Sequence, residues 1–215
     1  MTRTISQLRI LAVLALTGAG LLAWPAAATA QTVSGSASAV RASVFGMTTT
    51  LADTGPLADA SDLRDASDMA AGILSLGSAD VLHAATGASP DSVASEASLA
   101  DAGLAVAGNF ISAAFVMARA LAPAAGSPVG TSEIDGLSIN GVPVTVTGQP
   151  NQTVWLLGGR VILNEQVPTS TGTTVNAVHV IVSGVADVVL ATASAGVGSS
   201  GSGLPLPPPP LPPLF

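Results

Sequence analysis

The chain has 215 residues, of which 9% are charged and 3% are aromatic, and it contains neither cysteine nor tyrosine. The lack of cysteine excludes a disulfide scaffold, a thiolate zinc site and a cysteine nucleophile. A net charge of −7 argues against nucleic acid as a partner because phosphate would be repelled, and 48% apolar residues argue against a wholly disordered chain.

Residues 1–30 have the pattern of a secretory signal peptide. Arg3 and Arg9 form a positive start, residues 10–23 form a short apolar run, and residues 28–30 read Ala-Thr-Ala. This order of charge, apolar run and small residues is typical of a cleaved signal. An uncleaved membrane anchor is the alternative, but the run is shorter than the roughly 20 residues that a spanning helix needs. Pro25 would also interrupt such a helix.

We therefore expect cleavage between Ala30 and Gln31, which leaves one domain-sized chain. Two of the six arginines are lost with the signal and all 13 acidic residues remain, so the net charge becomes −9. No later apolar run is long enough to span a membrane. The sequence predicts a protein that is secreted or held at the cell surface, with no integral membrane span after cleavage.

The region from Gln31 to Pro128 is dominated by Ala, Ser, Gly, Val and Leu and is hard to assign. Alanine content alone would allow a helix over residues 92–122. Glycines interrupt that segment, residues 104–107 alternate, and residues 110–116 are rich in β-branched and aromatic side chains. We favour strands over residues 92–122, with a helix as the alternative.

Three hairpin signals follow between Gly136 and Ala193. Asn140-Gly141, Gly158-Gly159 and Ser183-Gly184 each separate two runs of branched apolar residues. Such pairs suit two-residue turns, and Asn-Gly suits them best because both central residues need positive φ. Three consecutive signals predict an antiparallel sheet, and Pro143 predicts an edge position because proline cannot donate a ladder hydrogen bond.

The predicted fold is therefore mainly β, an antiparallel β-sandwich-like domain over residues 31–195. Residues 175–182 are apolar at nearly every position, which predicts a strand that is buried on both faces. Trp155 lies in a predicted strand, and we expect it to pack in the core. Residues 196–215 run from Gly/Ser into a proline-rich end, which predicts a disordered tail that serves as a spacer.

Candidates for metal or nucleotide binding are weak. Asp59, Asp62, Asp65 and Asp68 recur every three residues and are the only calcium candidates, but the spacing and the glycine of an EF-hand loop are absent. A solvated acidic segment is the favoured interpretation. Residues 196–201 match G-x-G-x-x-G, yet a proline tail follows where a nucleotide site needs a helix. We predict no cofactor and no further metal site.

His179 and Asp187 raise the possibility of a Ser-His-Asp triad. The serine elbow G-x-S-x-G is absent, and His179 falls in a strand that looks buried. A hydrogen-bonded structural histidine is therefore the favoured interpretation. A secreted hydrolase that uses a serine, His179 and Asp187 remains the alternative.

Four short segments resemble the choice-of-anchor P family of secreted bacterial surface proteins. They are residues 136–144 (GLSINGVPV), 161–166 (VILNEQ), 174–180 (TVNAVHV) and 184–189 (GVADVV). The resemblance is strongest over residues 131–195 and implies a surface domain whose C-terminal sorting signal varies between members. It implies no catalytic residues. An LPxTG-like motif, an anchor helix and a basic terminal cluster, which such proteins carry at their ends, are not seen after the spacer.

These observations lead to two hypotheses. The preferred one is a non-enzymatic secreted or cell-surface β-domain with a structural or adhesive role towards an unknown surface or matrix partner. The alternative is the secreted hydrolase. The sequence does not identify the ligand or the oligomeric state.

Overall fold

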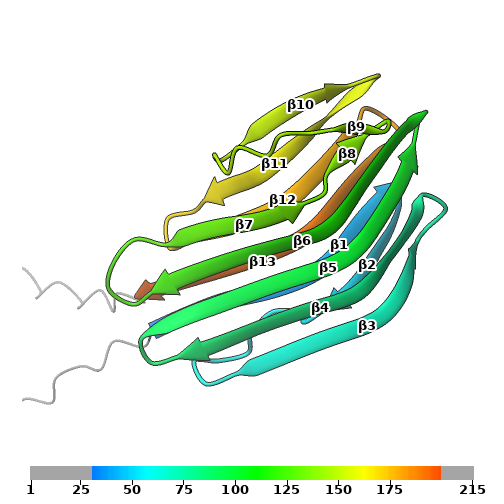
Figure 1. Cartoon of the computed structure of the whole chain (residues 1–215). Coiled ribbons are helices and arrows are strands. Elements are labelled where there is room, and N and C mark those ends of the chain that lie inside the picture. Colours follow the sequence, from blue (N-terminus) through cyan, green and yellow to red (C-terminus); the bar gives the residue numbers. More distant parts are fainter. Residues whose placement is uncertain (1–30, 200–215) are drawn as a thin grey trace, which may run out of the picture.

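The computed structural model describes residues 31–199, which form thirteen β-strands and no helix. Two antiparallel sheets lie face to face (Figure 1). This confirms the mainly β prediction and is consistent with a β-sandwich. The predicted signal peptide and residues 200–215 of the predicted tail lie outside the described residues. Because the described residues contain no helix, none of them provides an apolar helix that could cross a membrane.

The six-stranded sheet pairs the last strands of the chain with the first two. Its spatial order is β10 (Gln152–Leu156), β11 (Gly159–Pro168), β12 (Gly172–Val182), β13 (Ala186–Ser199), β1 (Gln31–Val44) and β2 (Met47–Asp53). Strands β1 and β13 pair from Gln31↔Ser199 to Val44↔Ala186. The first and last described residues are therefore neighbours at one end of the sandwich.

The seven-stranded sheet contains the middle of the chain. Its order is β3 (Leu63–Ile73), β4 (Gly77–Ser89), β5 (Ser92–Val106), β6 (Asn109–Pro123), β8 (Ser138–Ile139) and β9 (Val142–Pro143), and β7 (Val129–Asp135) also pairs with β6. Residues 92–122 are thus strands and the turn between them, as favoured from the sequence, and the helical alternative is wrong.

The predicted hairpins are present. Asn140 and Gly141 have φ values of 53° and 78°, as the short β8–β9 turn requires. Pro143 lies on the edge strand β9, as predicted. The β10–β11 turn is formed by Leu157 and Gly158, one residue earlier than predicted, because Gly159 already pairs with Leu156.

The core lies between the sheets and consists mainly of Ala, Val and Leu. Strand β13 packs across the sandwich against β5 and β6, and the Ser95 hydroxyl donates to the Ser194 carbonyl at 2.7 Å. Small side chains allow this close approach of the two sheets. Each of them buries little area, so the stability must come from many strands sharing one core.

A row of residues with positive φ, which we call the crease, crosses the six-stranded sheet from strand to strand. The strand register is the same on both sides of it. Four residues with φ between 45° and 61° lie in one row across the strands. They are Ala52 on β2, Ala191 on β13, Asn164 on β11 and Asn151 just before β10, and strands β1 and β12 contribute the positions between them. On either side of Ala191, Ser38 pairs with Thr192 and Val40 with Leu190. A residue in the left-handed conformation interrupts the alternation of side chains between the two faces of the strand. The positions that face the core therefore switch from one set of alternate residues to the other at this row.

The seven-stranded sheet has a matching crease at Val81, Asp101 and Gly136, which all have positive φ. On β5, Val93, Ala97 and Leu99 are buried before the crease, whereas Leu104 and Val106 are buried after it. The buried positions therefore change from odd to even numbers within one strand. This phase change explains why the strand alternation of residues 92–122 was difficult to recognise in the sequence.

The creases and turns correct three expectations. Residues 175–182 are not buried on both faces, because His179 and Ile181 remain partly exposed while Val178 and Val180 face the core. Trp155 is not a core residue, since 76% of its surface is exposed. The tail does not begin at Gly196, because β13 continues to Ser199 and pairs there with β1.

Candidate functional site

Six tight hairpin turns meet at the end of the sandwich opposite Gln31 and Ser199 (Figure 1). They connect β1–β2, β3–β4, β5–β6, β8–β9, β10–β11 and β12–β13. We call this region the turn end and define it as residues 45–47, 74–76, 107–110, 140–142, 155–160 and 183–185. It brings together segments from both sheets and from almost the whole length of the described chain.

Hydrogen bonds join these turns to one another. The backbone N–H of Phe45 donates to Val185 at 3.1 Å, and that of Ser183 donates to the Gly158 carbonyl at 3.4 Å. Asn109 bridges the sheets, because its buried side-chain amide donates to the Leu157 carbonyl at 3.1 Å.

The remaining turns are held in the same way. The Phe110 N–H donates to the Asn140 side-chain oxygen and the Asn140 N–H donates to the Phe110 carbonyl, both at 2.7 Å. The Ala105 N–H donates to the Leu76 carbonyl at 2.7 Å. Backbone and side-chain hydrogen bonds therefore connect the six turns, with the Leu76 turn joined through Ala105 on β5.

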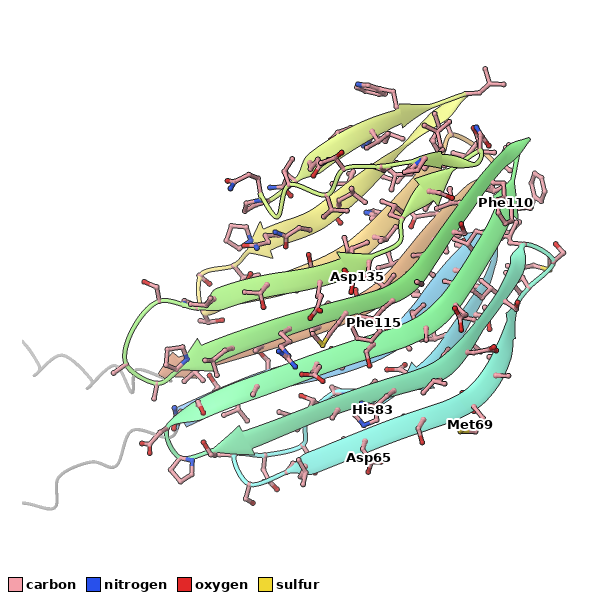
Figure 2. All side chains as sticks on the ribbon, viewed as in Figure 1. Asp65, Met69, His83, Phe110, Phe115 and Asp135 are labelled. Atoms are coloured by element: carbon pink, nitrogen blue, oxygen red, sulfur yellow. The ribbon has the colours of Figure 1, made fainter. Side chains whose placement is uncertain are left out.

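Large apolar side chains are exposed on these turns. Seven of them lie at the turn end: Phe45, Met47, Leu74, Phe110, Val142, Trp155 and Leu157. Leu157 and Trp155 are 79% and 76% exposed, and Figure 2 shows Phe110 at the same end of the sandwich. In a chain with so few aromatic residues, the clustering of three exposed rings on one end marks a candidate interaction site.

The turn end is almost free of charge. Arg160 is the only charged residue within the segments that define it. Arg160 pairs with Trp155 across the β10–β11 hairpin, so the guanidinium and indole groups belong to neighbouring strand positions. The carboxylate of Asp187 lies close by in sequence, but it is hydrogen-bonded to His179 at 3.1 Å.

A second polar feature lies on the outer face of the six-stranded sheet, beside the crease. His179 Nδ1 lies 2.7 Å from Glu165 Oε2, and His179 Nε2 lies 3.1 Å from Asp187 Oδ1. The Asn176 amide donates to the same Glu165 oxygen at 2.6 Å and its carbonyl oxygen accepts from Thr192. This polar network of five side chains connects β11, β12 and β13.

The network brings together His179 and Asp187, the two residues named in the hydrolase hypothesis, but it does not provide a triad. A triad histidine needs one ring nitrogen to activate the serine hydroxyl while the other is held by a carboxylate. Here Glu165 occupies the position where the serine would have to be, and no hydroxyl is hydrogen-bonded to the ring among residues 31–199. The geometry is that of a histidine held between two carboxylates.

The four calcium candidates are not gathered at one place. Asp59 and Asp62 belong to the β2–β3 connection, whereas Asp65 and Asp68 lie on β3. Hydrogen bonds from the backbone N–H and the hydroxyl of Ser61 lower the pKa of Asp59. The backbone N–H of Ala58 lowers the pKa of Asp62, with a further contribution from the Arg64 side chain. Within residues 31–199, no group of three His, Asp or Glu side chains is arranged to hold a metal ion.

A shallow groove of about 640 Å³ runs over the outer face of the seven-stranded sheet, near the end that holds Gln31 and Ser199. Small residues such as Gly87 and Ala94 line it together with the exposed side chains of Leu63, Leu121 and Val129. The ion pair between Glu96 and Arg119 also lines the groove. Unlike the turn end, the groove is lined by no aromatic side chain.

The sequence predicted three of the six turns, those after β8, β10 and β12, but not the surface that the six turns form. The available signal was the position of the rare aromatic and large apolar residues next to turn glycines, as in Phe45-Gly46 and Leu157-Gly158. Which turns share one end depends on the pairing of strands far apart in sequence, and no local pattern reveals it.

Comparisons with protein families, with curated proteins and with solved structures gave no match for this chain. They therefore do not bear on the resemblance to the choice-of-anchor P family, which stays a prediction.

Proposed function

We propose that this chain is a non-enzymatic β-domain protein, secreted or held at the cell surface, that adheres to other surfaces through its turn end. The observation that supports this proposal most strongly is the group of exposed apolar side chains on five of the six connected turns at one end of the sandwich. The resemblance to choice-of-anchor P proteins and the signal-like residues 1–30 support the location.

The energetics of the turn end suit adhesion. Removing a large apolar side chain from water contributes about 1.5–3 kcal/mol when burial is complete. Turns that are already fixed by hydrogen bonds lose little conformational entropy when they bind, so more of that energy remains for affinity. Ser199, the last described residue before the predicted spacer, lies at the end of the sandwich opposite the turn end.

Retention on an apolar solid tests the proposal. Residues 31–215 contain every strand and every core residue described here, and their adsorption to octyl-coated beads can be compared with that to glycol-coated beads. Leu157→Ser changes the turn end, whereas Leu63→Ser is a matched control because both leucines are 79% exposed. We expect Leu157→Ser alone to reduce adsorption. Equal losses in the two variants would contradict the proposal.

A secreted hydrolase remains a second candidate because His179 and Asp187 are hydrogen-bonded at 3.1 Å. Glu165 on the other ring nitrogen argues against it. Turnover of broad ester and peptide substrates by the chain and by His179→Ala separates the two functions. We expect no turnover that depends on His179, and its detection would overturn the non-enzymatic proposal.

A further inference from the structure

We infer that the turn end binds the boundary between headgroups and acyl chains of a phospholipid surface with zwitterionic headgroups. This inference rests on the proposed function and names the partner of the same site. It follows from the form of the apolar surface, from the pairing of Trp155 with Arg160 and from the distribution of charge.

The apolar side chains stand on separate turns and do not form one groove. Phe45, Leu157 and Val142 are 74%, 79% and 64% exposed, and they belong to three different hairpins. A folded protein partner would need a separate recess for each of them, because a densely packed protein surface deforms little. A lipid surface is fluid and accommodates several protruding side chains at once.

Trp155 and Arg160 have the chemistry of the membrane interface. Tryptophan is enriched where acyl chains meet headgroups, because its ring is apolar and its indole N–H is polar. Arg160 is the cross-strand partner of Trp155 and forms no ion pair within residues 31–199. When Trp155 lies at the membrane interface, the guanidinium group of its neighbour Arg160 can donate to a headgroup phosphate. The methylene groups of the arginine side chain then stay among apolar groups.

The charge distribution favours zwitterionic headgroups over anionic ones. After the predicted cleavage the chain carries four arginines and 13 acidic residues, so an anionic surface repels the molecule as a whole. The segments of the turn end contain no carboxylate. Asp187 lies in the same cross-strand row as Arg160, but its carboxylate is hydrogen-bonded to His179. A neutral surface can therefore approach this end without burying an unpartnered carboxylate.

A sugar ligand fits the same surface less well. Recognition of sugar hydroxyls needs several polar side chains around an aromatic ring, whereas the turn end offers Arg160 and an Asn140 side chain that already accepts from Phe110. A second copy of the chain remains a physical competitor for an apolar surface, and it is one of the outcomes of the test below.

The experiment uses the fluorescence of residues 31–215, in which Trp155 is the only tryptophan. Vesicles of phosphatidylcholine should shift its emission to shorter wavelength, and brominated acyl chains should quench it. Leu157→Ser should weaken vesicle binding about tenfold, and Arg160→Gln about fivefold through the loss of a hydrogen bond to a headgroup phosphate. Leu63→Ser, the matched control, should change binding less than twofold.

The other outcomes are distinguishable. Adsorption to octyl beads without any Trp155 shift on phosphatidylcholine vesicles would overturn the lipid inference and leave the proposed function intact. Failure in both assays would overturn both. Tighter binding to vesicles that contain anionic phosphatidylglycerol would overturn the assignment of zwitterionic headgroups. Self-association in analytical ultracentrifugation that Leu157→Ser abolishes would assign the surface to a second copy.

Discussion

The two ends of this sandwich are built in different ways. At the turn end the hairpin connections are short, hydrogen bonds between backbones join them, and apolar side chains point outwards. At the opposite end, the β2–β3 connection is longer and is held by its own polar side chains. Asp59 accepts from Ser61 there, and Asp62 accepts from Ala58 and Arg64.

This difference shows that exposed apolar residues are not simply a result of a weakly polar sequence. The chain does place charged side chains and their hydrogen bonds in the β2–β3 connection. At the turn end, backbone hydrogen bonds between turns and the side chains of Asn109 and Asn140 hold the structure, and the exposed apolar side chains take no part in these bonds. The apolar residues there are consequently free to serve binding, and the following predictions test that separation.

The largest expected effect separates core leucines from turn-end leucines. Leu99 is completely buried on β5, and Leu99→Ala should lower the free energy of unfolding by about 2–5 kcal/mol because it leaves a cavity. Leu157→Ala should change it by less than about 0.5 kcal/mol, since the side chain is exposed. Urea denaturation measures both values. A large loss for Leu157→Ala would assign that residue to stability and not to binding.

The next effect concerns the polar network beside the crease. Glu165→Ala removes the acceptor shared by His179 and Asn176 and should lower the free energy of unfolding by about 1–3 kcal/mol. Glu133→Ala is the control, because Glu133 is an exposed strand residue on β7 and should matter little. If thermal and urea unfolding show equal losses in the two variants, the network does not stabilise the sheet.

A smaller effect tests the crease that lies between the two ends. Val81 has a φ of 50°, which strains a β-branched residue by about 1–3 kcal/mol. Val81→Gly should leave the stability unchanged or raise it, because relief of strain offsets the higher entropy of the unfolded chain. Val129→Gly should lower it by about 1 kcal/mol, and Val129 is a suitable control because both valines are 55% exposed. Equal losses would show that Val81 is unstrained.

The smallest effect is confined to the end opposite the turns. The pKa values of Asp59 and Asp62 are lowered by hydrogen bonds, so their contribution to stability is present above the unfolded pKa of 3.8. It is lost as the pH falls through the lower folded values. We expect the protection factor of the Ser61 amide in deuterium exchange to fall as the pH passes below those lowered values, while the Asn109 and Phe110 amides keep theirs. Loss of protection at both ends together would contradict the comparison.

Much of the fold was predictable because hairpin turns have local signals. Asn140-Gly141 and Gly158 mark turns through their need for positive φ, and the structure shows those values. The crease was not predictable, since Ala52, Ala191 and Val81 are residues that rarely adopt positive φ. The crease also explains the wrong prediction for residues 175–182. The core-facing positions change from one set of alternate residues to the other at the crease, so in the sequence they look like two buried faces.

The site was less predictable than the fold. The sequence pointed to His179 and Asp187, and the structure brings them together, but the third partner is Glu165 and not a serine. Glu165 and His179 are 14 residues apart in the sequence, and only the pairing of β11 with β12 brings their side chains together. Trp155 was placed in the core because strand residues of its size usually are buried, whereas the end of a short hairpin leaves it exposed.

The most direct measurement of the central claim is carbene footprinting of residues 31–215 before and after adsorption to an apolar surface. The account predicts that labelling falls at Phe45, Trp155 and Leu157, while labelling of Leu63 and Val129 at the opposite end is unchanged. Protection of Leu63 and Val129 with continued labelling of Trp155 would contradict it, because the adhesive surface would then be the groove on the seven-stranded sheet.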